Sequence, residues 1–352
     1  MPTMKRMQVS TDAALEEKDT NIEQLERELA TCQETLQRLQ HSVLSELQLP
    51  LSLMWRRGQD MPFEMNYHPG AVVLRGKVYV GGGSTTFMKS NTVMVYDTQR
   101  DDWSTLPQYL FKWFSLAIVN GQLVLVGGVD GTDKMTKKLG VWNERVRKWT
   151  NPYPPMLTER TGALVVSTHI NNNSDSWLVV AGGYSSNSGG CSTVEVLNTS
   201  TKLWYSGPPL PTPMYKMSSA VIGHTWYLLG GRDLLSMSTV LCTSLDDLIF
   251  KTILHAADQS GSTPPTDSTK SPWRVLCDSP SERCTALALR GALLAVGGSA
   301  IFLYKPGTNS WTRIGEMPSE RRECTCTVLP SGEVFIVGGY THHVDICTLK
   351  NT

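Results

Sequence analysis

Hydrophobic residues follow two different periods along this 352-residue chain, and the change comes at Pro50. Between residues 11 and 48 there is no Gly or Pro, and apolar residues recur at every seventh position, with a second set three residues later. The two sets are Leu15, Ile22, Leu29, Leu36 and Val43, and Leu25, Cys32 and Leu39. This pattern predicts one long α-helix with a coiled-coil seam at 11–48, after a disordered N-terminus at 1–10.

A single helix with one apolar stripe is marginal in water, so we expect it to pair with another coiled coil, most simply a second copy of the chain. Two alternatives stay open. The stripe could pack on the rest of its own chain, or the helix could be the end of a longer coiled coil.

After Pro50 the pattern changes to short β-branched and aromatic runs separated by Gly, Pro, Asn and Asp, which predicts an all-β region. Six short apolar strands end in a glycine pair: Gly82-Gly83, Gly127-Gly128, Gly182-Gly183, Gly230-Gly231, Gly297-Gly298 and Gly338-Gly339. Four times, a large apolar residue on a later strand precedes a tryptophan by seven positions: Tyr96 and Trp103, Trp142 and Trp149, Leu197 and Trp204, Tyr304 and Trp311. Such a repeat predicts four-stranded sheets, with strands a to d from the inside outward, that bury their faces by stacking on one another.

The combination of a strand, a glycine pair, an aromatic residue and a tryptophan resembles the Kelch repeat. The resemblance covers about residues 51–352 and implies a six-bladed β-propeller. The fourth unit departs from the pattern, because its tryptophan is Trp273 and a Ser/Thr/Pro-rich stretch precedes it; we expect a flexible insertion at 256–272. The sixth unit ends without a tryptophan, and the segment 51–62 carries Trp55, so we expect that segment to supply the missing outer strand.

Kelch propellers generally bind partners through their d–a and b–c loops, and the resemblance implies that face here. Basic residues or histidine align at the entry to each strand a: His68, Lys112, Arg160, Lys216, Arg283 and Arg322. If these positions are equivalent, they form a basic ring that suits an acidic peptide. The alternative is that they bond loop carbonyls and neighbouring blades. Phe87, Tyr184 and Tyr340 in the b–c loops are further candidate contacts.

The remaining composition narrows the classes of function. Lys+Arg and Asp+Glu both number 32, which argues against general nucleic-acid or anionic-membrane binding. No signal peptide or segment of about 20 apolar residues is present, so we expect a cytoplasmic protein with reduced thiols. The pair His342-His343 is not expected to bind metal, because adjacent strand residues face opposite ways. The Cys324-x-Cys326 pair is a weak metal signal.

No catalytic motif or cofactor site is found in the sequence. We therefore expect a non-catalytic protein-interaction scaffold or adaptor that self-associates through its coiled coil. The alternatives are a ubiquitin-ligase substrate receptor that acts through a partner, since no BTB domain is recognised in these residues, or an actin-binding cytoskeletal protein. A catalytic propeller is the reading that the sequence favours least.

Overall fold

The computed structural model describes residues 51–66, 69–83, 91–169, 176–232, 239–258, 271–281 and 284–351. The chain divides into two compact units, Met1–Gln48 and Leu49–Thr352, and every described residue belongs to the second unit. The predicted disordered N-terminus at 1–10 and the coiled coil at 11–48 lie outside the described residues, as do His68, Phe87 and Arg283. Among the described helices, none is long and apolar enough to span a membrane.

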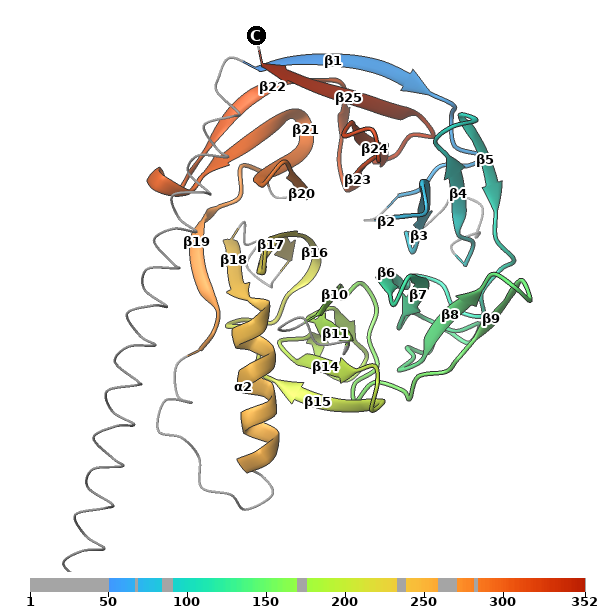
Figure 1. Ribbon diagram of the computed structural model, residues 1–352, viewed down its shortest axis with the longest axis vertical. Coiled ribbons are helices and arrows are strands. Elements are labelled where there is room, and N and C mark those ends of the chain that lie inside the picture. The colour runs from blue at the N-terminus through green and yellow to red at the C-terminus, as the bar shows by residue number, and fades with distance from the viewer. Residues whose placement is uncertain are drawn as a thin grey trace, which may run out of the picture. The chain divides into compact units, whose positions relative to one another are not determined.

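Six antiparallel sheets stand side by side in a ring, which confirms the predicted all-β six-bladed propeller (Figure 1). Blade 1 contains β2 (Gly70–Leu74), β3 (Lys77–Gly81), β4 (Met94–Asp97) and β5 (Asp102–Thr105). Blade 2 contains β6 (Ser115–Val119), β7 (Gln122–Val126), β8 (Leu139–Asn143) and β9 (Lys148–Thr150). Blade 3 contains β10 (Leu164–His169), β11 (Ser176–Ala181), β14 (Val194–Asn198) and β15 (Leu203–Gly207).

The second half of the ring is less regular. Blade 4 contains β16 (Tyr215–Ile222), β17 (Thr225–Arg232), β18 (Thr239–Ser244) and β19 (Arg274–Asp278). Blade 5 contains β20 (Thr285–Leu289), β21 (Ala292–Lys305) and β22 (Ser310–Arg321), with a short 3-10 turn at Pro306–Thr308. Blade 6 contains β23 (Cys324–Val328), β24 (Val334–Gly338), β25 (Val344–Asn351) and β1 (Leu51–Gly58). A small hairpin, β12 (Tyr184–Ser185) with β13 (Gly189–Gly190), forms the b–c loop of blade 3.

The ring closes through its most distant strands in sequence. β1 pairs antiparallel with β25 over its whole length, from Leu51 opposite Asn351 to Gly58 opposite Val344. The outer strand of blade 6 therefore comes from the start of the propeller, and this sheet has four strands although only three come from the C-terminal repeat.

Blade 5 has no separate b–c loop. The first part of β21 pairs with β20, and its second part, from Ala300 onward, pairs with β22. One 14-residue element thus occupies the places that strands b and c hold elsewhere. This repeat is short, with thirteen residues from Gly298 to Trp311, and leaves no residues for a loop.

One helix was not predicted. α2 (Leu245–Asp258) lies between β18 and β19 and packs on β15 and β18. Its buried face carries Leu245, Leu248 and Ile249, spaced as one side of a helix. Residues 256–258 are therefore helical, which corrects the predicted start of the flexible insertion; residues 259–270 lie outside the described part.

The core lies between the blades rather than within one of them. One cluster joins Val80 and Tyr96 of blade 1 to Phe335 and Val337 of blade 6, and four similar clusters occupy other junctions. The second strand of blades 1, 2, 3 and 6 is buried on both faces, which explains why β3, β7, β11 and β24 read as continuous apolar runs.

Tryptophans at the start of strand d join blades 1 to 4 to the blade that precedes each of them. Trp103, Trp149 and Trp204 lie directly opposite Tyr96, Trp142 and Leu197, and Trp311 lies opposite Tyr304. Four indole N–H groups donate to a carbonyl just after strand d of the preceding blade: Trp103 to Gln59 (2.8 Å), Trp149 to Pro107 (2.7 Å), Trp204 to Pro154 (2.9 Å) and Trp273 to Pro208 (3.1 Å). The same residue therefore supplies apolar area and a directional contact between blades.

Candidate functional site

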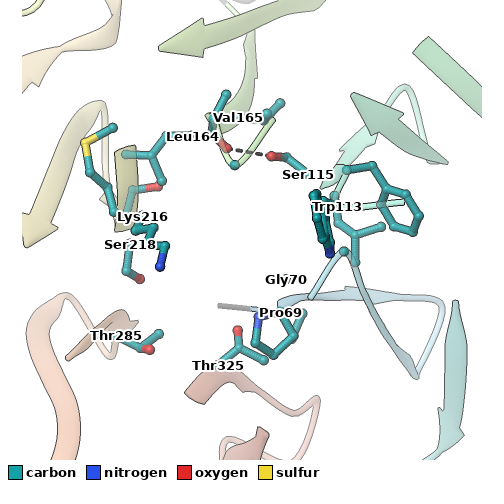
Figure 2. A pocket seen from close by; sticks show the side chains of 18 of the residues that line it. Pro69, Gly70, Trp113, Ser115, Leu164, Val165, Lys216, Ser218, Thr285 and Thr325 are labelled. Atoms are coloured by element: carbon teal, nitrogen blue, oxygen red, sulfur yellow. Dashed lines mark hydrogen bonds between the residues drawn. The ribbon is translucent and has the colours of Figure 1, made fainter. Parts of the chain in front are cut away.

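A cavity of about 610 Å³ occupies the centre of the ring. It is lined by the innermost strands of all six blades, β2, β6, β10, β16, β20 and β23, and Figure 2 shows residues from each of them around the opening. Cavities that bind ligands in proteins are commonly about 300–1,000 Å³. The channel is therefore large enough to receive several side chains of a partner.

Hydroxyl groups on the channel wall join neighbouring blades. The Ser115 Oγ donates to the carbonyl of Ala163 at 2.6 Å, the contact dashed in Figure 2. The Thr285 hydroxyl donates to the carbonyl of Cys324, and the Ser218 Oγ accepts from the backbone N–H of Ala286 at 2.9 Å. Strands a of adjacent blades do not pair with one another, so these bonds provide the lateral polar contacts at the narrowest part of the ring.

Aromatic and basic side chains border the mouth of this channel. Trp113 and Lys216 project from opposite walls in Figure 2, and the Trp113 side chain is 39% exposed. Tyr184, in the b–c loop of blade 3, is 40% exposed and stacks edge-on against Tyr215 at 5.4 Å between ring centroids. Lys216 is the one charged side chain in the described lining.

Trp113 is an exposed residue of the channel lining that sequence reasoning missed. It directly follows Lys112, whose Nζ lies 4.9 Å from the Trp113 ring centroid and 2.7 Å from an Asp133 carboxylate oxygen. The tryptophan next to Lys112 was itself an available signal, but the alignment used only the basic residue.

The predicted basic ring is wrong in its alignment. At the entry to strand a, each described loop has one residue in the left-handed conformation: Trp113 (φ 57°), Gly162 (φ 59°), Lys216 (φ 56°) and Glu323 (φ 58°). Relative to that residue, Lys112 and Arg322 lie one position before, Arg160 lies two before, and Lys216 is the residue itself. The basic side chains therefore occupy three different positions of the repeat. Aligning the loops by residue type alone produced the error, because other arginines and lysines occur next to the true equivalents.

The residue equivalent to Arg160 is Arg321, and both are fully buried. Arg160 donates to the carbonyl of Gly182 at 2.8 Å and pairs with Glu195 on strand c. Arg321 donates to the carbonyl of Gly338 at 2.8 Å and bonds Asp345 on strand c at 3.0 Å. Arg160 is thus withdrawn as a partner contact: it joins the glycine-pair turn to strand c inside its own blade.

The exposed charges of the neighbouring loops are of both signs. Arg322 bonds Glu320 at 2.7 Å, as Lys112 bonds Asp133. Glu159 accepts hydrogen bonds from its own backbone N–H and from the Ser185 and Ser186 hydroxyls, and these lower the pKa of its carboxyl. Tyr340, an exposed loop residue between β24 and β25 with φ 65°, adds a further aromatic group to a b–c loop. The surface is amphipathic rather than uniformly basic.

The seven described cysteines are free thiols. Cys324 and Cys326 are buried on β23, and burial raises the pKa of both thiols, so they are protonated at neutral pH. Their environment is that of core residues in blade 6.

Comparison with known proteins agrees with this architecture. The Kelch motif matches residues 65–108 and 178–211. Kelch-like protein 23 of Pongo abelii is 23% identical over 303 residues, covering 80% of this chain and 48% of the relative. Beta-scruin of Limulus polyphemus is 23% identical over 307 residues, covering 80% of this chain and 31% of the relative.

The chain thus spans about half the length, or less, of these curated relatives. The solved structure of YjhT superposes with a TM-score of 0.60 at 14% identity, covering 83% of this chain and 99% of YjhT. Together with the six observed blades, these matches support a Kelch-repeat β-propeller.

Proposed function

We propose that this propeller is a non-catalytic interaction module that binds a segment of a partner protein at the mouth of its central channel. The observation that carries the proposal is the pair of exposed aromatic side chains, Trp113 and Tyr184, that flank a 610 Å³ opening lined by all six blades. Exposed tryptophan and tyrosine beside a concave surface are the residues that most often dominate protein-binding energy.

The lining favours recognition through apolar contact and hydrogen bonds. It is made of small, apolar and hydroxyl-bearing residues, with Lys216 at one side. The expectation of an acidic partner segment no longer rests on a ring of six basic positions, because Arg160 is buried and Lys112 and Arg322 have carboxylate neighbours. We retain a protein partner as the proposed ligand class and make its charge an outcome of the test.

The test is affinity capture from a lysate with the full chain, comparing wild type with a Trp113→Asn, Tyr184→Ala double variant and with Lys216→Glu. Asn is chosen because it tolerates the left-handed backbone at position 113. The control is Phe250→Ala, which removes an aromatic side chain that is 60% exposed on α2, the helix packed on outer strand β15.

We expect the aromatic variant to bind its specific partners at least about tenfold more weakly, a loss of at least about 1.4 kcal/mol of binding free energy. Phe250→Ala should keep the same partners. Loss of a partner in the Lys216→Glu variant would indicate that the partner segment is acidic. Equal partner lists for the folded aromatic variant and the wild type would contradict binding at this mouth.

Self-association through residues 11–48 is the second part of the proposal, supported by the heptad pattern of the sequence. Linking several propellers would raise avidity without any new contact. Sedimentation of wild type against a Leu29→Glu, Leu36→Glu variant tests it, and a wild-type monomer at micromolar concentration would contradict it. The cytoplasmic location stays a prediction.

A further inference from the structure

Three metal-ligating side chains meet where the propeller closes. Asp60 follows the closing strand β1, and His342 and His343 precede β25, its partner strand. The sequence argued against a histidine pair because neighbours on a strand face opposite ways. Both histidines instead lie in the loop before β25, and both rings reach the same carboxylate.

We propose that Asp60, His342 and His343 form a binding site for a divalent cation of the zinc class. The Nδ1 of His343 lies 3.1 Å from both Asp60 carboxylate oxygens, and the Nε2 of His342 lies 3.3 Å from Oδ2. All three ligand atoms lie within 4.8 Å of one another. In a tetrahedral zinc site with bonds of about 2.0–2.1 Å, adjacent ligand atoms are about 3.3 Å apart. The two histidine–carboxylate distances therefore match the spacing that the metal requires, and the two histidine nitrogens lie within 4.8 Å of each other.

The backbone holds the two ligand-bearing segments together without a metal. Gly58 pairs with Val344, and the N–H of Met61 donates to the carbonyl of His342 at 2.7 Å. Asp60 and the two histidines are thus anchored on the two sides of the β1–β25 pairing, which we call the closing seam. Side-chain rotation is then the main change that binding requires. Such preorganisation lowers the entropic cost of assembling a site.

Exposure and charge are compatible with entry of an ion. The three side chains are each about 40–50% exposed, which allows access and leaves a fourth position for water. The Arg57 guanidinium competes with a metal ion for Asp60, since its Nε lies 3.6 Å from Asp60 Oδ1. Arg57 is half exposed and can turn into solvent. Imidazole with one carboxylate favours Zn²⁺ over Mg²⁺ or Ca²⁺, which prefer oxygen ligands alone.

Binding here would link the start of the propeller to its last blade. Asp60 and His343 are 283 residues apart, and a bound cation would add a bridge beside the β1–β25 pairing. The ion would bind the closed ring and not the open one, so it would stabilise closure by mass action.

The experiment is calorimetric titration of the full chain with zinc sulfate, together with thermal unfolding. Wild type should bind one Zn²⁺ through this site, and saturation at about a hundredfold excess over Kd should raise the midpoint by about 5 °C. Asp60→Asn, His342→Ala and His343→Ala should each weaken binding at least about tenfold. The control is His224→Ala, which breaks a histidine–aspartate pair of 3.0 Å (with Asp246) that has no third ligand among the described residues.

Cobalt substitution separates this site from thiols elsewhere in the chain. A Co²⁺ complex of the proposed site should show tetrahedral visible absorption without a thiolate charge-transfer band, and Asp60→Asn, which preserves side-chain shape, should abolish it. Absence of Zn²⁺ binding by wild type would overturn the proposal. So would binding that persists unchanged in folded Asp60→Asn and His343→Ala proteins.

Discussion

At the scale of single residues, neighbours in sequence have opposite roles. Arg321 is fully buried and bonds Gly338, His343 and Asp345, whereas Arg322 is mostly exposed and contacts Glu320. A buried arginine whose donors are all directed at backbone and carboxylate groups holds a turn in place. Its exposed neighbour can be exchanged without disturbing the fold.

Arg321→Ala should lower the free energy of unfolding by about 3–5 kcal/mol, because it leaves the Asp345 carboxylate buried without its partner. Arg322→Ala should change it by less than about 0.5 kcal/mol. Urea denaturation of the two variants measures both. Similar costs for the two would show that the buried pair contributes no more than the surface pair.

At the scale of elements, the glycine pair fixes how one blade approaches the next. The backbone N–H of Gly128 donates to the Arg160 carbonyl of blade 3 at 2.9 Å, and that of Gly183 donates to the Met214 carbonyl of blade 4 at 2.8 Å. A Cβ on Gly127 would lie 2.2 Å from the Arg160 carbonyl oxygen, so only glycine allows this contact. The close approach between blades therefore explains why glycine pairs repeat along the sequence.

Gly127→Ala and Gly121→Ala separate crowding from backbone conformation. Both glycines have positive φ, 65° and 68°, but a Cβ on Gly121 meets nothing within 4 Å. Gly121→Ala should cost about 1–2 kcal/mol from the left-handed conformation alone. Gly127→Ala should cost at least about 2 kcal/mol more, because the neighbouring blade must shift. Thermal unfolding of the two variants measures both costs. Equal losses of stability would contradict a role for Gly127 in the contact between blades.

At the scale of the whole molecule, closure depends on one strand pairing and on the side chains that cross it. Arg56 on β1 makes a two-pronged contact with Glu333, at 2.9 and 3.0 Å. The hydrogen bond from Arg56 is the main cause that lowers the pKa of Glu333 to about 2. The ion pair therefore stabilises the seam only while Glu333 is ionised.

Stability should fall with pH because of this pair. The Glu333 pKa lies below the unfolded value of about 4.3, so its contribution is fully present above that pH and is lost as pH falls through about 2. Since Arg56 is half exposed, we expect an effect of about 1 kcal/mol. Arg56→Ala should flatten the unfolding free energy between about pH 5 and 2, relative to wild type.

The control is Arg313→Ala, which removes an arginine of equal exposure from a pair with Glu316 on β22, outside the β1–β25 pairing. Its pH profile should run parallel to that of wild type. If the unfolding free energy of Arg56→Ala also runs parallel to that of wild type, the Arg56–Glu333 pair does not contribute to the acid sensitivity of the protein.

The unpredicted helix shows where a sequence signal was present but unused. Leu245, Leu248, Ile249 and Thr252 follow helical spacing, and the Ser244 hydroxyl accepts from the Asp247 N–H at 3.4 Å, as a capping residue does. The prediction from the sequence was a flexible insertion at 256–272, and no element was predicted for residues 245–255. The apolar period of residues 245–252 is the signal that could have predicted this helix.

The sequence by itself determined the blade repeat, since alternating apolar runs, turn glycines and the spacing of tryptophan from its cross-strand partner are local properties. Only the tertiary structure decided which arginines are buried, because the basic residues stand at different positions relative to the left-handed residue of each described loop. It also decided that Asp60 meets His342 and His343, which is a consequence of closing the ring with β1. Contacts between residues 283 apart depend on how the blades stack, and no local pattern encodes that arrangement.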